Sequence, residues 1–222
     1  MKKNEKILNE ALINRGYFNN IVKGEINETG YKTKAKFDII LNKRTQIDSV
    51  IIVPGTDIFS SEFENIAKKQ NFGQFFDLDK LKQNRLNIDT EMRQKGYFNF
   101  KPEFVSFWAD STQAYKKVKL KVGPKPTLSQ ADRKQFQIND IFVNIDSKTS
   151  IVKDSTENDF FRGLIFDDPK HKFKEDLFAD AIAFRPGTPF NNDMQSITNN
   201  RLVGVGAFKL VNSSFAVVNR LD

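Results

Sequence analysis

One pattern occurs three times in this sequence and constrains the fold more than any other feature. Each copy is a helix that ends at a glycine and is followed within two residues by an aromatic side chain; the glycines are Gly16, Gly96 and Gly206. An apolar residue precedes each glycine by four positions, one helical turn away on the buried side: Leu12, Met92 and Leu202. Glycine adopts the left-handed conformation that ends a helix at little cost. The pattern predicts three equivalent joins between a helix and a strand, with the glycines as structural caps.

Residues of alternating polarity follow the first two joins. The apolar residues Ala35, Phe37, Ile39 and Leu41 alternate with charged residues, and Val118, Leu120 and Val122 alternate with lysines. This period of two predicts strands with one buried face. Two further apolar runs, at 47–53 and 138–145, have the length and composition of strands.

The run after Gly96 predicts an edge strand. Phe98, Phe100, Phe104 and Trp108 are separated by even numbers of residues, as on one face of a strand. Pro102 lies inside this run, and a proline cannot donate a hydrogen bond to a neighbouring strand. We therefore expect this strand at the edge of its sheet.

Two helices are expected between Gly55 and Gly96. Ser61 and Glu64 have the spacing of a capping box that opens the first helix. Asp77 is a suitable N-cap for the second. The middle segment, 45–123, therefore reads β-α-α-β-β. Residues 1–44 supply only the last helix and two strands of such a module. Residues 124–222 form a third copy, which has an inserted loop near 146–183 and stops before its last strand.

Composition argues against several classes of function. The chain has no cysteine and one histidine, His171, which leaves no catalytic triad and no nitrogen- or sulfur-based metal cluster. No stretch approaches the roughly 20 apolar residues of a membrane-spanning helix. Residues 1–3 resemble the start of a signal peptide, but polar residues follow where its apolar region would begin. We expect a soluble segment of a longer protein that is not an enzyme and binds no cofactor or metal.

The formal net charge of +7 is concentrated locally. Between residues 116 and 134, seven basic residues face the single acidic residue Asp132. Such a surface fits nucleic acid, an anionic membrane or an acidic partner, and it also fits a solvated strand edge and loop. The sequence leaves these alternatives open.

The helix that ends in Gly96-Tyr97-Phe98, the same tripeptide at Gly16, and the β-α-α-β-β order with 80 residues between the two glycines resemble the POTRA domains of the BamA/TamA family. Residues 184–190 and the sequence around Gly206 are similar to the POTRA domain nearest the barrel in TamA-like proteins. The Phe-, Asn- and Lys-rich composition resembles a Bacteroidota homologue of the TamL type. The implied fold is α+β: tandem POTRA repeats, each a three-stranded mixed sheet covered by two helices.

The resemblance also implies a function. POTRA domains are periplasmic and receive unfolded outer-membrane β-barrel precursors, they meet periplasmic or inner-membrane assembly partners, and an outer-membrane barrel is attached in the full-length protein. Strand addition at an open sheet edge tolerates many guest sequences. The contact residues expected along the edge strand are Tyr97, Asn99, Lys101, Glu103 and Val105, with Met92 and Gln94 in the adjacent groove. The alternatives are a basic nucleic-acid-binding protein, disfavoured because no RNA-binding motif is present, and a purely structural spacer.

Overall fold

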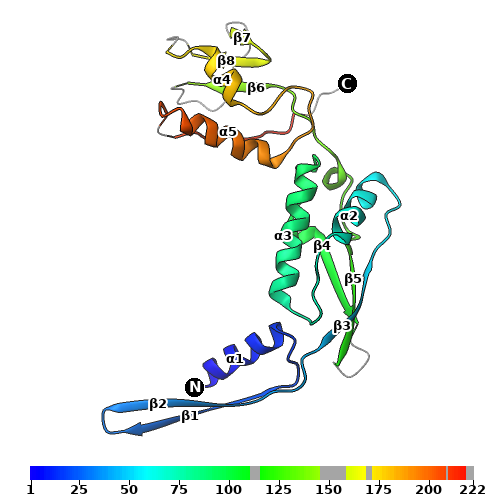
Figure 1. The fold of residues 1–222 in the computed structure, drawn as a ribbon, viewed down its shortest axis with the longest axis vertical. Helices are drawn as coiled ribbons and strands as arrows, with labels where there is room; N and C mark the ends of the chain where they lie inside the picture. Colours follow the sequence, from blue (N-terminus) through cyan, green and yellow to red (C-terminus); the bar gives the residue numbers. More distant parts are fainter. Residues whose placement is uncertain (111–115, 146–158, 169–171, 209, 219–222) are drawn as a thin grey trace. The chain divides into compact units, whose positions relative to one another are not determined.

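The computed structural model describes residues 1–110, 116–145, 159–168, 172–208 and 210–218 (Figure 1). These residues form three separate sheets, whose strand orders are β1-β2, β3-β5-β4 and β6-β8-β7. Packing groups them into two compact units, residues 1–92 with 100–133 and residues 93–99 with 134–222. The predicted module boundaries near 44 and 123 fall between sheets, although the first two sheets share one compact unit. The division into three modules remains a prediction.

The middle sheet confirms the expected β-α-α-β-β order. The elements are β3 (Gln46–Ile52), α2 (Ile58–Lys68), α3 (Leu78–Gln94), β4 (Val105–Asp110) and β5 (Lys117–Pro124). The central strand β5 pairs in parallel with β3 and antiparallel with β4. Its alternate residues Val118, Leu120 and Val122 are at most 3% exposed, as the period-two pattern predicted.

The two helices supply the rest of this core. Helix α2 buries Phe59, Phe63, Ile66 and Ala67, and α3 buries Leu81, Asn84, Ile88 and Met92. Both sets follow the helical period, so one apolar stripe of each helix is removed from water. The Phe100 ring packs against Phe59 and Phe63, with ring centroids 6.1 and 6.5 Å apart.

The predicted capping box at Ser61 and Glu64 is wrong. Helix α2 begins one turn earlier, where the Asp57 carboxylate accepts a hydrogen bond from the Ser60 N–H at 2.6 Å. Glu64 instead accepts the N–H of Gly55 at 2.7 Å and pairs with Lys68. The expectation for α3 is confirmed, because Asp77 accepts the N–H groups of Asp79 and Lys80.

The predicted strand over 97–105 is also wrong, because β4 begins only at Val105. Pro102 instead opens a short 3-10 helix (Pro102–Phe104). Phe98 packs in the second compact unit and Phe100 in the first. In a regular strand, residues two positions apart point to the same face. Because the rings of Phe98 and Phe100 pack in different units, the two residues do not belong to one regular strand.

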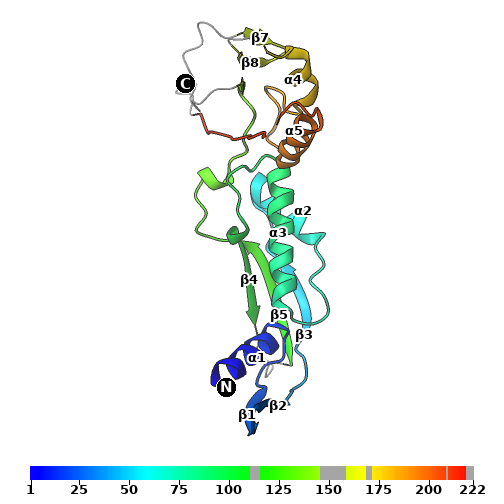
Figure 2. The same cartoon turned by 90° about the vertical axis from the view of Figure 1, so that its left-hand side faces the viewer.

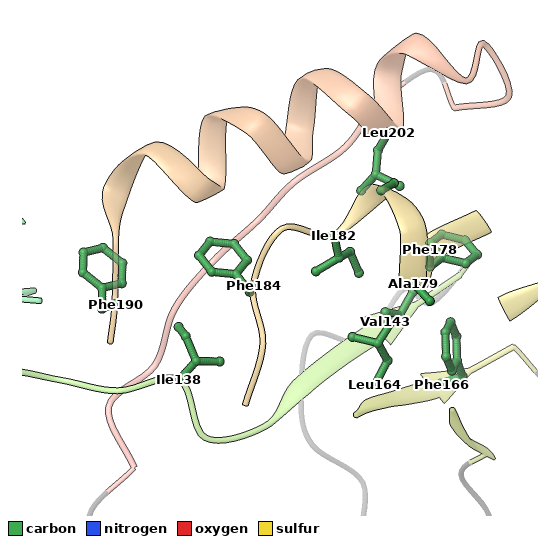
Figure 3. Close-up of a cluster of buried hydrophobic side chains, with 11 residues drawn as sticks. Ile138, Val143, Leu164, Phe166, Phe178, Ala179, Ile182, Phe184, Phe190 and Leu202 are labelled. Atoms are coloured by element: carbon green, nitrogen blue, oxygen red, sulfur yellow. The ribbon is translucent and has the colours of Figure 1, made fainter. Parts of the chain in front are cut away.

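The third sheet combines β6 (Ile141–Asn144) with a hairpin of β7 (Asp159–Phe161) and β8 (Leu164–Asp167). Its strand directions match those of the middle sheet, since β8 lies parallel to β6 and antiparallel to β7. Helices α4 (Glu175–Ala181) and α5 (Asn192–Gly204) follow. Apolar side chains such as Phe166, Phe178 and Leu202 fill the space between α5, α4 and the strands (Figure 3).

Two expectations about this last segment need correction. The stretch 146–183 is more than a loop with a short helix, because it contains β7 and β8. In addition, no strand follows Gly206 among the described residues of 205–218. Phe208 packs against Phe173 and Phe178 instead, and Phe215 packs against Phe184 and Phe190. Residues 146–158, and 169–171 with the single histidine, lie outside the described part.

The first two glycine joins are confirmed as equivalent structures. Gly16 and Gly96 have φ values of +84° and +96°. The Gly16 carbonyl accepts the Thr45 N–H at 2.8 Å, and the Gly96 carbonyl accepts the Phe136 N–H at 2.8 Å. An aromatic ring two residues beyond each glycine packs near this bond: Phe18 packs on Phe76, whose N–H donates to the Thr45 carbonyl, and Phe98 packs on Phe136. Each join therefore attaches a helix end to the start of the following module.

The first sheet is simpler than the others. Strands β1 (Ile21–Thr29) and β2 (Lys32–Ile40) form an antiparallel hairpin, and α1 (Lys2–Asn14) lies along it (Figure 1). The Glu5 carboxylate on α1 accepts the Gly24 N–H at 2.7 Å. Gly24 leaves room for Met1 and Phe37, whose side chains would lie within 3 Å of an added Cβ.

The Gly16→Ala substitution should loosen the first join. An added Cβ would lie 2.5 Å from the Phe76 carbonyl oxygen, in addition to the strain of a positive φ. We expect faster amide exchange at Thr45, whose N–H is bound by Gly16. Gly206→Ala is the matched control, because Gly206 has φ +75° and nothing within 4 Å of its Cβ position. Its cost should be limited to backbone strain of about 1 kcal/mol. Equal destabilisation by the two changes would contradict the packing role of Gly16.

The Asp57 cap should make stability depend on pH. Its hydrogen bonds to Ser60 and then the charge of Arg133, 3.2 Å away, hold the pKa of the Asp57 carboxyl below its usual value. A lowered pKa in the folded state stabilises the fold above the unfolded-state pKa of about 4, and this contribution is lost as pH falls. Asp57→Ala should cost about 1 kcal/mol at neutral pH. The difference from wild type in denaturant unfolding should shrink below about pH 4, and a difference that stays constant with pH would contradict this role of Asp57.

Candidate functional site

Strand β4 is an open edge of the middle sheet (Figure 2). The Lys125 N–H donates to the Phe104 carbonyl at 2.8 Å, which sets the phase of the antiparallel ladder. Backbone groups alternate in direction along such a strand. Those of Ser106, Trp108 and Asp110 therefore point to β5, and those of Val105, Phe107 and Ala109 point away from the sheet. The Val105 N–H already donates to the Pro102 carbonyl, so Phe107 and Ala109 are the positions whose N–H and carbonyl can both pair with another chain.

A cluster of three side chains supports this edge from the helix side. The Phe107 ring packs edge-on against Phe72, with centroids 6.2 Å apart. The guanidinium of Arg85, on α3, lies 5.3 Å from the centre of the Phe107 ring. The Arg85 Nε is buried and has no hydrogen-bond partner among the described residues. A buried donor without a partner is costly, so an acceptor supplied by a guest chain would relieve it.

The opposite face of the sheet is basic and carries an exposed aromatic side chain. Trp108 is 40% exposed, and the ammonium of Lys121, its direct neighbour on β5, lies 5.8 Å from its ring centre. Lys117 pairs with Asp48 at 3.3 Å, which offsets part of the positive charge. Gly123 lacks the Cβ that would otherwise lie 2.6 Å from a methyl carbon of Val53.

The structure places the residues expected at the site in three different environments. Tyr97, Val105 and Met92 are at most 1% exposed. Asn99 is half-buried, and Lys101 and Glu103 are exposed, on a segment that precedes β4 and does not belong to it. Gln94 donates a hydrogen bond to Asp193 at 2.6 Å, within the second compact unit. The predicted residues therefore do not form one continuous side-chain surface.

Sequence reasoning missed the residues that form the open edge. Phe107, Ala109 and Arg85 were not singled out, because the predicted strand began eight residues early and its phase was taken from Phe98. The signal was present in the alternation of Val105, Phe107 and Ala109 with more polar residues. The alternation of lysines with buried apolar residues on β5 was predicted correctly, and it identifies the basic face of the same sheet.

The described residues contain no group of three or more His, Cys, Asp or Glu side chains able to hold a metal ion. Within that same part of the chain, no helix combines the length and apolar character needed to cross a bilayer.

The solved structures that match this chain include regions of three proteins. The crystal structure of Haemophilus influenzae BamA POTRA3-5 aligns over 100% of this chain and 75% of its own, with a TM-score of 0.52 and 15% identity. POTRA1-3 of Omp85 from Anabaena and the N-terminal domain of Omp85 from Thermosynechococcus elongatus align over 95% and 96% of this chain and 74% and 75% of their own. Each has 17% identity and a TM-score of 0.31. No protein-family model and no curated protein matches the sequence. The predicted α+β fold, with mixed three-stranded sheets and helices, is confirmed as that of POTRA domains.

Replacing Arg85 by leucine should separate stability from binding. The change removes a cation–ring contact worth about 1 kcal/mol and also removes a buried donor without a partner. We expect the free energy of unfolding to change by less than about 1 kcal/mol. Phe107→Ala, which leaves a void beside Phe72, should cost about 2 kcal/mol or more. Chemical denaturation measures both, and a larger loss for Arg85→Leu would mean that Arg85 is mainly structural.

Proposed function

We propose that this chain is a POTRA-type polypeptide-binding region that receives extended guest segments at the open edge of β4. The observation that carries the proposal is the phase of β4, which turns the backbone groups of Phe107 and Ala109 away from β5, with no other described strand beside them. Main-chain pairing adds a strand with little dependence on the guest's side chains. A receptor for many different precursors requires this tolerance.

The predicted contact residues enter the proposal in revised roles. Lys101 and Glu103 lie exposed just before β4 and can contact the flank of an added strand. Val105 and Met92, buried in the same compact unit as β4, support the edge from within the core, whereas Tyr97 is buried in the other unit. Arg85 offers its unsatisfied donor to a carbonyl or carboxylate of the guest, close to Phe107.

The wider role belongs to the same proposal. We place the chain in the periplasm, as part of a BamA/TamA-type outer-membrane assembly protein of TamL-like character, acting without catalysis or cofactor. Its guests would be unfolded β-barrel precursors, and its partners would include periplasmic or inner-membrane assembly proteins and an attached barrel. The fold likeness to BamA POTRA3-5 supports this placement.

The test uses a synthetic peptide of about ten alternating apolar and polar residues that ends in an aromatic residue, as barrel strands do. We expect its titration to shift the NMR signals of residues 105–110 in the full chain. Ala109→Pro should weaken binding about tenfold or more, because it removes an outward N–H without removing a bond to β5. Ala109→Ser is the matched control and should bind as wild type does.

The guest supplies an independent check of strand addition. Two peptides are compared, one N-methylated at its odd-numbered positions and one at its even-numbered positions. One of them should lose binding and the other should not, since only one of the two sets of N–H groups faces β4. Equal loss in both phases would refute backbone pairing. An absence of peptide shifts would favour the spacer alternative. Salt-sensitive binding of random RNA without peptide binding would favour nucleic acid.

A further inference from the structure

Helices α1 and α3 are copies of one another with different surroundings. A shift of 80 positions superposes Gly16 on Gly96 and brings Met1, Asn4, Leu8 and Leu12 onto Leu81, Asn84, Ile88 and Met92. All four residues on α3 are at most 4% exposed, whereas none of their counterparts on α1 is buried. The same stripe of a repeated helix is thus covered in one module and open in the other.

Strands β2 and β5 show the same contrast. Each is the second strand after its glycine and pairs antiparallel with the first. The apolar face of β5 is at most 3% exposed. On β2 and just beyond it, Ile39 and Leu41 are 44% and 51% exposed, and Ile26 across the hairpin is 50% exposed. These alternate positions share the face of Phe37, which lies beside Gly24 and Met1 under α1.

The middle module shows what covers this face in a complete copy. Strand β3 lies parallel to β5 on the side away from β4, and α2 follows it with Phe63, Ile66 and Ala67 turned inward. Both of these elements are missing beside β2, whose sheet has two strands in the described chain. One edge of β2 and one side of α1 are therefore open together.

We propose that the face formed by α1 and the open edge of β2 binds a polypeptide segment made of an aliphatic strand followed by an amphipathic helix. The strand would lie parallel to β2, as β3 lies beside β5, and the helix would cover Ile39, Leu41 and Leu8. This inference does not depend on guest binding at β4, which concerns a different sheet and an antiparallel edge.

The charged residues on β2 indicate which side chains the bound segment should have. Strand β2 carries Lys32, Lys34 and Lys36 on the face opposite α1, much as β5 carries its lysines, and Lys36 pairs with Asp38 of the same strand at 3.0 Å. On β3, Asp48 pairs with Lys117 of β5 at 3.3 Å. The matching strand should therefore have aliphatic residues at alternate positions and an acidic residue among those facing the lysines.

The test supplies such a segment from the chain itself. A second copy of residues 45–80, which contains β3 and α2, is joined directly before Met1, so that the shift of 80 positions is continued. We expect amide exchange at Ile39 and Ile40 to slow by about a hundredfold or more, as for backbone groups that become part of a packed sheet. Exchange in 105–110 should not change, so failure here and failure at β4 can be told apart.

The matched control carries Phe63→Ser and Ile66→Ser in the added copy only, which removes the apolar stripe of its helix. This variant should give little protection of β2. Unchanged exchange with the unmodified copy would overturn the proposal, and so would equal protection by both copies. Concentration-dependent protection of β2 in the original chain would also overturn it, because a second copy of the chain would then be the occupant.

Discussion

The hydrogen bond from the start of one module to a glycine carbonyl in the module before it holds this chain together. It forms twice, from Thr45 to Gly16 and from Phe136 to Gly96, each at 2.8 Å. The glycine must have a positive φ to turn its carbonyl out of the helix, and Gly16 must also lack a Cβ, because the Phe76 carbonyl oxygen lies 2.5 Å from that position. One backbone conformation therefore both ends a helix and fixes where the next sheet begins.

The two joins differ in the side chains that complete them. At the first, Arg44 donates to the Arg15 carbonyl at 2.7 Å, pairs with the cap residue Asp77 at 3.1 Å and lies over the Phe75 ring. At the second, Gln135 donates to the Lys95 carbonyl at 3.0 Å, and aromatic rings around Phe98 take the place of the ion pair. A polar join and an aromatic join thus use one backbone arrangement, which explains how the repeat remains recognisable while its side chains change.

Much of the fold could be read from the sequence because its signals are local. The glycine caps, the alternation on β2 and β5 and the Asp77 cap each depend on neighbouring residues. The predictions that were wrong concern residues whose positions depend on contacts with distant parts of the sequence. Phe98 and Phe100 look like one face of a strand, yet they enter different cores. The prediction of the site was affected most, because Phe98 and Phe100 suggested a strand from residue 97, whereas β4 begins only at Val105.

The open edges follow from the order of elements in this fold. A β-α-α-β-β module places its last strand in the centre, so the strand before it has one free side, as β4 does. A module that has only the last helix and two strands exposes the central strand as well, as at β2. Exposed edges invite unwanted pairing, and charged side chains near them limit it. The lysines on β2, and those on β5 next to the edge strand β4, leave backbone pairing at these edges available to a guest while making aggregation between like-charged copies unfavourable.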